Sequence, residues 1–148
     1  MLQKNVSVKK VNLIVSVIFV IILGVSVALQ INMNKKNAIL ACDIAMDQAE
    51  EIVKTSVQKG EGIEELIYEM PYTDIITTYL VDNVDDTFIQ TEKAPEKRYY
   101  SVTDFDGTKS YMVSEICEQY QLAVTYPINI ANNNIPLMFA ILAGALFC

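Results

Sequence analysis

The chain has 148 residues, a net charge of −7, 52% hydrophobic residues and no histidine. This length fits one ordinary domain, and the lack of histidine excludes imidazole metal ligands and histidine-based acid–base catalysis. The sequence also contains no P-loop, no dinucleotide-binding glycine pattern and no nucleophile that a histidine could activate. We therefore expect this chain to have no enzymatic activity, no cofactor and no metal site.

An uncharged, apolar stretch covers residues 11–29, and its only polar side chains are those of Asn12, Ser16 and Ser26. Its length is close to the roughly 20 apolar residues that cross the hydrocarbon core of a bilayer. We therefore expect a transmembrane helix over residues 11–32, with the lipid bilayer as a partner of the chain.

The residues before this helix predict its orientation. Residues 1–10 carry three lysines and no acid, and basic flanks remain on the cytoplasmic side of a membrane. This pattern predicts a cell-membrane protein with a cytoplasmic N-terminus and an extracytoplasmic segment over residues 33–134. A cleaved signal peptide is the alternative, because Ser26 and Ala28 have the spacing of a cleavage site. A mature N-terminus at Leu29 would reveal that cleavage.

Residues 33–134 are acidic, with eight basic residues against all 18 acidic residues of the chain, a net charge of −10. Binding of nucleic acid requires lysines and arginines that neutralise phosphates. This composition therefore excludes nucleic acid as a partner.

Helical spacing continues over residues 38–58, where apolar and small residues recur every three or four positions and acidic residues lie between them. We predict an amphipathic helix that is continuous with the transmembrane helix or separated from it by a slight kink, and that is ended by Gly60 and Gly62. A homodimer is expected to form through this helix, with the exposed part of its apolar stripe as the contact. A short helix over residues 63–70 should stop before Pro71.

The remaining pattern of β-branched and aromatic residues between turn residues predicts five strands, at residues 75–82, 87–91, 99–103, 108–117 and 121–129. Short turns connect them without a long crossover helix, so the sheet should be antiparallel. The fold class is therefore α+β, in which a long N-terminal transmembrane and amphipathic helix packs on a small antiparallel sheet.

Two cysteines, Cys42 and Cys117, lie between the apolar ends of the chain. In this layout Cys117 precedes the outermost turn, about 25–30 Å beyond Cys42, whereas a disulfide needs Cα atoms within about 7 Å. We expect no bond between them.

The last residues, 135–148, are apolar or small from Pro136 onward. Fourteen residues of helix reach about 21 Å, which is less than the roughly 30 Å of a hydrocarbon core. The stretch of Asn132, Asn133 and Asn134 offers a polar exit from the last strand and a helix cap, and Pro136 suits the first turn of a helix. We interpret this stretch as an incomplete second transmembrane helix.

This order of elements resembles the extracytoplasmic PAS-like sensor domains, of the single-Cache type, found in bacterial two-span receptors. The resemblance covers residues 33–134 and is carried by the 38–58 helix, by TTYLVDNVDDTFIQTE (77–92) and by TKSYMVSEICEQYQLAVTYPIN (108–129). The helical insert that usually precedes the later strands is reduced here to KAPEKR (93–98).

The resemblance implies a signal-input role. Such a domain binds a small extracellular molecule or senses the envelope, and it transmits a helix shift to a cytoplasmic output that this chain does not contain. A sensor histidine kinase is the leading output, and a diguanylate cyclase or a chemotaxis-type receptor is the alternative. A membrane-anchored, non-signalling interaction module is a further alternative of a different class.

The resemblance also implies a ligand pocket on the sheet face away from the long helix. We expect five residues to line it: Tyr79, Arg98, Tyr100, Tyr111 and Tyr126. Tyrosines offer an apolar ring with a hydroxyl group, and an arginine can bind a carboxylate through two hydrogen bonds. In the alternative interpretation the tyrosines are core or rim residues and Arg98 pairs with Glu92 or Glu96.

Overall fold

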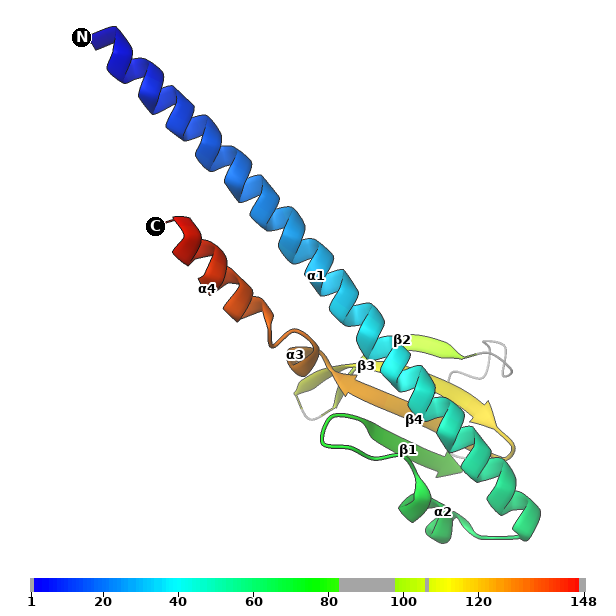
Figure 1. The fold of residues 1–148 in the computed structure, drawn as a ribbon. Coiled ribbons are helices and arrows are strands. Elements are labelled where there is room, and N and C mark those ends of the chain that lie inside the picture. The colour runs from blue at the N-terminus through cyan, green and yellow to red at the C-terminus, as the bar shows by residue number, and fades with distance from the viewer. Residues whose placement is uncertain (1, 83–97, 106, 147–148) are drawn as a thin grey trace. The chain divides into compact units, whose positions relative to one another are not determined.

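The computed structural model describes residues 2–82, 98–105 and 107–146, which divide into two compact units, one of residues 1–33 with 134–148 and one of residues 34–133. The fold class is α+β, as expected, with a long N-terminal helix packed on a four-stranded antiparallel sheet and a C-terminal helix (Figure 1). In chain order the elements are α1 (Leu2–Lys59), α2 (Ile63–Glu69), β1 (Thr77–Asp82), β2 (Tyr99–Phe105), β3 (Thr108–Cys117), β4 (Tyr120–Pro127), α3 (Ile128–Ala131) and α4 (Ile135–Leu146).

The predicted continuity of the first helix is confirmed, because α1 is a single helix of 58 residues. No glycine or proline interrupts residues 25–59, so nothing in the sequence breaks the backbone ladder there. Gly60 has φ 76, and the N–H groups of Gly60 and Glu61 donate to the carbonyls of Val57 and Ser56. These two bonds form a Schellman motif, which satisfies the last carbonyls of the helix.

In the unit of residues 1–33 and 134–148, most of the large apolar side chains of α1 between residues 8 and 33 are exposed, while Phe19, Leu23 and Val27 are half-buried. The helix is long and apolar enough to cross a membrane. α4 begins directly after Asn134, whose carbonyl accepts a hydrogen bond from the Met138 N–H at 3.1 Å. Pro136 lies in the first turn of this helix, as predicted.

In the unit of residues 34–133, the strand order of the sheet is β1-β4-β3-β2, and every neighbouring pair is antiparallel. The strands at 108–117 and near 75–82 and 99–103 are confirmed with small shifts of their ends, while the strand expected at 87–91 lies outside the described residues. The strand expected at 121–129 ends instead at Pro127, and Ile128–Ala131 form the short helix α3. Pro127 has no N–H to continue the ladder, which explains the earlier end.

The core of this unit lies between one side of α1 and one face of the sheet. Helix residues at three- and four-residue intervals pack against alternate residues of β3 and β4. The fully or nearly buried members on α1 are Cys42, Ala45, Met46, Ala49 and Val53, and those on the two strands are Val113, Cys117, Tyr120, Leu122 and Val124.

Both buried cysteines are free, as predicted. The charge of Lys54 affects the Cys117 thiol, so Cys117 lies near Lys54. Lys54 follows Cys42 by twelve residues, about 18 Å along the helix, so the two cysteines are far apart. Burial raises the pKa of the Cys42 thiol to about 12, with a smaller contribution from Asp43, and burial raises that of Cys117 to about 11. Both thiols are therefore protonated and unreactive at neutral pH.

Two substitutions on α1 test this packing. Met46→Ala should lower the free energy of unfolding by about 2–5 kcal/mol, because it leaves a cavity where a fully buried side chain packs. Gln58→Ala removes an exposed side chain of the same helix, and it should change stability by less than about 0.5 kcal/mol. Thermal unfolding followed by the near-ultraviolet circular dichroism of the tyrosines measures both. Equal losses in the two variants would contradict this arrangement.

Candidate functional site

The most connected polar group in the described residues is Arg98, which lies directly before β2. Its Nε donates to Glu115 Oε2 at 2.7 Å, its Nη1 to Asp43 Oδ1 at 3.2 Å, and its Nη2 to Glu50 Oε1 at 2.8 Å. Nη2 also donates to Asp47 Oδ1. We call Arg98 and these four carboxylates the Arg98 cluster.

The cluster joins three elements of the unit. Asp43, Asp47 and Glu50 lie at positions i, i+4 and i+7 of α1 and therefore share one side of the helix. Glu115 lies near the end of β3, and the Tyr100 hydroxyl of β2 donates to Asp43 Oδ1 at 3.0 Å. Arg98 thus ties the helix to the β2–β3 edge of the sheet.

The electrostatics of the cluster are unbalanced, because one guanidinium faces four carboxylates, a net charge of −3 when all are ionised. Partial burial opposes charging of Arg98, but the hydrogen bonds to Asp47, Glu50 and Glu115 raise its pKa further above its ordinary value. Arg98 therefore stays charged at every accessible pH.

Two carboxyl groups of the cluster differ in pKa. Burial acts to raise the pKa of Glu50, yet hydrogen bonds with Glu115, Arg98 and Lys54 lower it to about 2. Burial, together with the hydrogen bond and the negative charge of Glu50, raises the pKa of Glu115 above its ordinary value, against the opposing effect of Arg98. Desolvation and the bond to Asp43 also raise the pKa of Tyr100.

The structure places the five predicted ligand residues in different surroundings. Tyr126 packs beside the core, on the same sheet face as Tyr111 and Tyr100, because strand partners and alternate residues share a face. Tyr79 is paired with Ala123, next to the inward-facing Leu122 and Val124, and therefore lies on the opposite face. Arg98 is occupied by its four carboxylates.

Of the five, Tyr100 and Tyr111 line a common cavity of about 310 Å³, between α1 and the β2–β3 edge. Lys35 and Ile39 of α1 contribute to the same cavity. The ligand role of all five residues stays a prediction. The expected alternative partners of Arg98, Glu92 and Glu96, lie outside the described residues.

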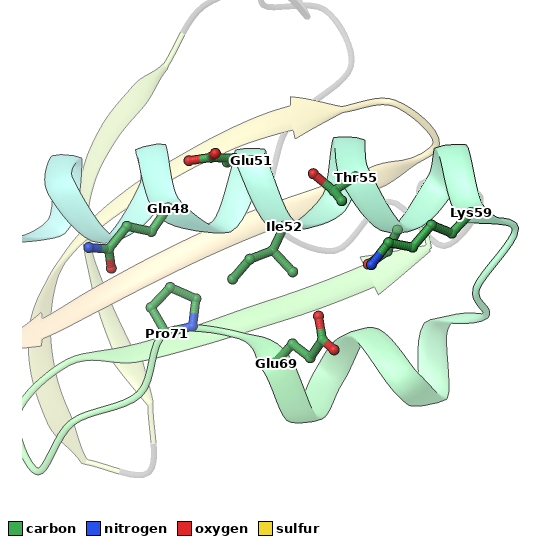
Figure 2. A pocket seen from close by; sticks show the side chains of 8 residues that line it. Gln48, Glu51, Ile52, Thr55, Lys59, Glu69 and Pro71 are labelled. Carbon is green, nitrogen blue, oxygen red and sulfur yellow. The ribbon is translucent and has the colours of Figure 1, made fainter.

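A larger cavity of about 460 Å³ lies between α1 and the segment around α2, and none of the five predicted residues lines it. Figure 2 shows Ile52 and Lys59 directed from α1 toward Glu69 and Pro71. Its other lining residues are Gln48, Glu51, Thr55 and Ser56.

The sheet face away from α1 carries buried polar side chains. Ser110 and Ser114 of β3 and Gln121 and Thr125 of β4 are all buried. The register places Ser101 of β2 on this face as well, and its hydroxyl is buried without a hydrogen-bond partner among the residues that the structure describes. A buried, unpartnered hydroxyl marks a place where a ligand or an ordered water can bind.

Metal chemistry has no arranged donor set in the described ranges. No group of three or more Asp, Glu or Cys side chains there is placed to hold a metal ion. The carboxylates that do converge are directed at Arg98.

The sequence prediction missed Asp43, Asp47, Glu50 and Glu115 as functional residues. Two signals were present: Arg98 is the single arginine of the chain, and three acids of the helix recur at i, i+4 and i+7. No local pattern could predict that residue 98 contacts residues 43–50.

No protein-family model, curated protein or solved structure matches this chain. The interpretation of the site therefore depends on its geometry.

Arg98→Gln tests whether the cluster holds the helix on the sheet. We expect a loss of about 1.5–3 kcal/mol in the free energy of unfolding at pH 7, because the hydrogen bonds to charged groups disappear and the carboxylates remain together. The matched control is Lys54→Gln, which removes a side chain that is 54% exposed and pairs with Glu50 at 3.0 Å. An exposed pair of this kind contributes little, so its melting temperature should hardly change. Equal changes in both variants would show that Arg98 is only another surface charge.

Proposed function

We propose that this chain is the signal-input part of a bacterial membrane receptor, with residues 34–133 outside the membrane as the sensing unit. The observation that carries the proposal is the Arg98 cluster on a helix that also contains the transmembrane segment. A change in the β2–β3 edge alters the contacts of Asp43, Asp47 and Glu50, so it acts directly on α1. Because α1 has no break, a shift or rotation at these residues is carried along the helix.

The closing hairpin supports the resemblance to PAS-like sensors. β3 pairs with β4 in an antiparallel hairpin over the segment on which the resemblance was based, and α3 and the apolar helix α4 follow it. A sensor histidine kinase is the output we propose, with a diguanylate cyclase or a chemotaxis-type output as the alternative.

The ligand of such a sensor is expected on the sheet face away from α1. Tyr79 and Ser101 both lie on that face, where the neighbouring polar side chains are already buried, and the Ser101 hydroxyl has no hydrogen-bond partner among the described residues. A small polar molecule suits this surface better than an apolar one, since each buried polar group needs a hydrogen-bond partner.

A homodimer through the 38–58 segment of α1 is part of the proposal. The sheet covers most of the apolar stripe of this segment, which leaves Leu40 and Ile44 as its exposed large apolar side chains, four residues apart on one side of the helix. A pair of such helices would bury these side chains against each other.

Alanine insertions test whether α1 transmits the signal. Residues 1–134 are joined to the second transmembrane helix and kinase part of a characterised two-span receptor, and one to four alanines are inserted after Met33. Each insertion turns the helix by about 100°, so kinase output should vary periodically and return toward its starting level after four insertions. The same alanines inserted after Glu61, beyond the end of α1, should change output little. Output that is indifferent to insertions after Met33 would refute the proposal.

Disulfide cross-linking tests the dimer. A Cys148→Ser background leaves the two buried, unreactive thiols in place. In membranes, cysteines introduced at Leu40 or Ile44 should form covalent dimers, whereas a cysteine at Lys54, which lies beside the Arg98 cluster, should not. Equal dimer yields at all three positions would count against a contact through this face of the helix.

A further inference from the structure

Glu50 and Glu115 bring two carboxyl groups together across the junction between helix and sheet. Glu50 comes from α1 and Glu115 from β3, and both accept hydrogen bonds from Arg98, Glu115 from Nε at 2.7 Å and Glu50 from Nη2 at 2.8 Å. Because Nε and Nη2 lie on the same edge of the guanidinium, the two carboxyl groups lie side by side, and a hydrogen bond between them would require a proton, since two carboxylates have only acceptors.

The charges around the Glu50–Glu115 pair favour its protonation. On α1 the neighbours of the pair are Asp43 and Asp47 on one side and Lys54 on the other. From the sheet the described groups that face it are Arg98 directly before β2, Tyr100 on β2 and Cys117 on β3.

Only two of these neighbours are cations, and Lys54 is the more exposed of them. The carboxylates outnumber Arg98 by three, and the side chains of Glu50 and Glu115 are only 18% and 19% exposed. When carboxylates lie close together with little water around them, the uptake of a proton by one of them lowers their mutual repulsion.

We propose that the Glu50–Glu115 pair is a proton-binding site, which holds α1 on the β2–β3 edge when it is protonated and weakens that junction when it loses the proton. The pair is one unit, so its two protons leave in two separate steps. The positive charge of Arg98 keeps the loss of the first proton at low pH. The mutual repulsion of the two carboxylates moves the loss of the second proton to higher pH. One consequence rests on the proposed receptor function: the stimulus would then be proton concentration outside the membrane.

The pH dependence has a defined sign. The pKa of Glu115 is raised in the folded chain, so the protonated carboxyl favours the fold. The stability that it contributes is fully present below the ordinary glutamate value of 4.5 and is lost as the pH rises through the folded pKa. Stability should therefore fall across that upper step, whereas the lowered pKa of Glu50 acts only near pH 2 to 4.5.

The direct test follows the carboxyl carbon of Glu115 by NMR between pH 4 and 8, in the full chain held in phosphatidylcholine nanodiscs. We expect a titration midpoint above 4.5, the ordinary glutamate value. A midpoint at or below that value overturns the proposal.

The Glu115→Gln variant gives a second readout that a merely structural ion pair would not produce. The new amide side chain keeps a donor for Glu50 and an acceptor for Arg98 without the negative charge, so the melting temperature at about pH 7.5 should exceed that of the wild type. Its dependence on pH across the upper step should also disappear. Glu51→Gln makes the same change of net charge at an exposed position of α1 and should retain the wild-type pH profile. A lower melting temperature for Glu115→Gln at this pH contradicts the proposal.

Failure of the proton site and failure of the receptor role are distinguishable. A normal midpoint for Glu115 together with periodic output from the alanine insertions would refute the proton site alone. A raised midpoint together with output that ignores the insertions would refute the receptor role alone.

Discussion

Arg98 places a positive charge where carboxylates of a helix and a strand converge, and the arrangement of the unit depends on this contact. Without it, Asp43, Asp47, Glu50 and Glu115 would face one another across a partly buried junction. With it, the side of α1 that bears these acids can lie next to the sheet while the neighbouring apolar side packs on β3 and β4. The same contact is the one on which the proposed signalling depends, because it joins α1 to the β2–β3 edge.

Hydrophobic packing and the ion cluster have different consequences for motion. The buried residues of α1 include alanines at 45 and 49 beside the flexible side chain of Met46. Packing of this kind is not directional, and it tolerates small shifts better than hydrogen bonds do. The five-membered Arg98 cluster, in contrast, has a fixed geometry, so a change in one partner favours one position of the helix over another. This combination fits a two-state element whose equilibrium a stimulus can shift.

Sequence patterns predicted most of the fold, because local signals determine most of it. An uninterrupted helical periodicity predicted the continuity of α1, Gly60 predicted its end, and alternating β-branched residues predicted the antiparallel strands. The end of β4 was placed two residues too late, because Pro127 stops the ladder although Ile128 and Asn129 continue the strand-like pattern. Such boundaries depend on single hydrogen bonds.

The site was less predictable than the fold, since it depends on which distant residues meet. Arg98 was identified as a residue with a role, but its partners on α1 are 48 to 55 residues away in the sequence. Likewise, the pairing register decides that Tyr79 and Tyr111 lie on opposite faces, and no composition signal encodes that register.

Amide hydrogen exchange can show whether Arg98 couples the helix to the edge of the sheet. Exchange is measured in the full chain for residues 43–53 of α1 and 99–105 of β2, in the wild type and in Arg98→Gln. We predict that exchange rises together in both segments of the variant, by a similar factor. If β2 alone exchanges faster and the helix keeps its wild-type protection, the coupling does not exist.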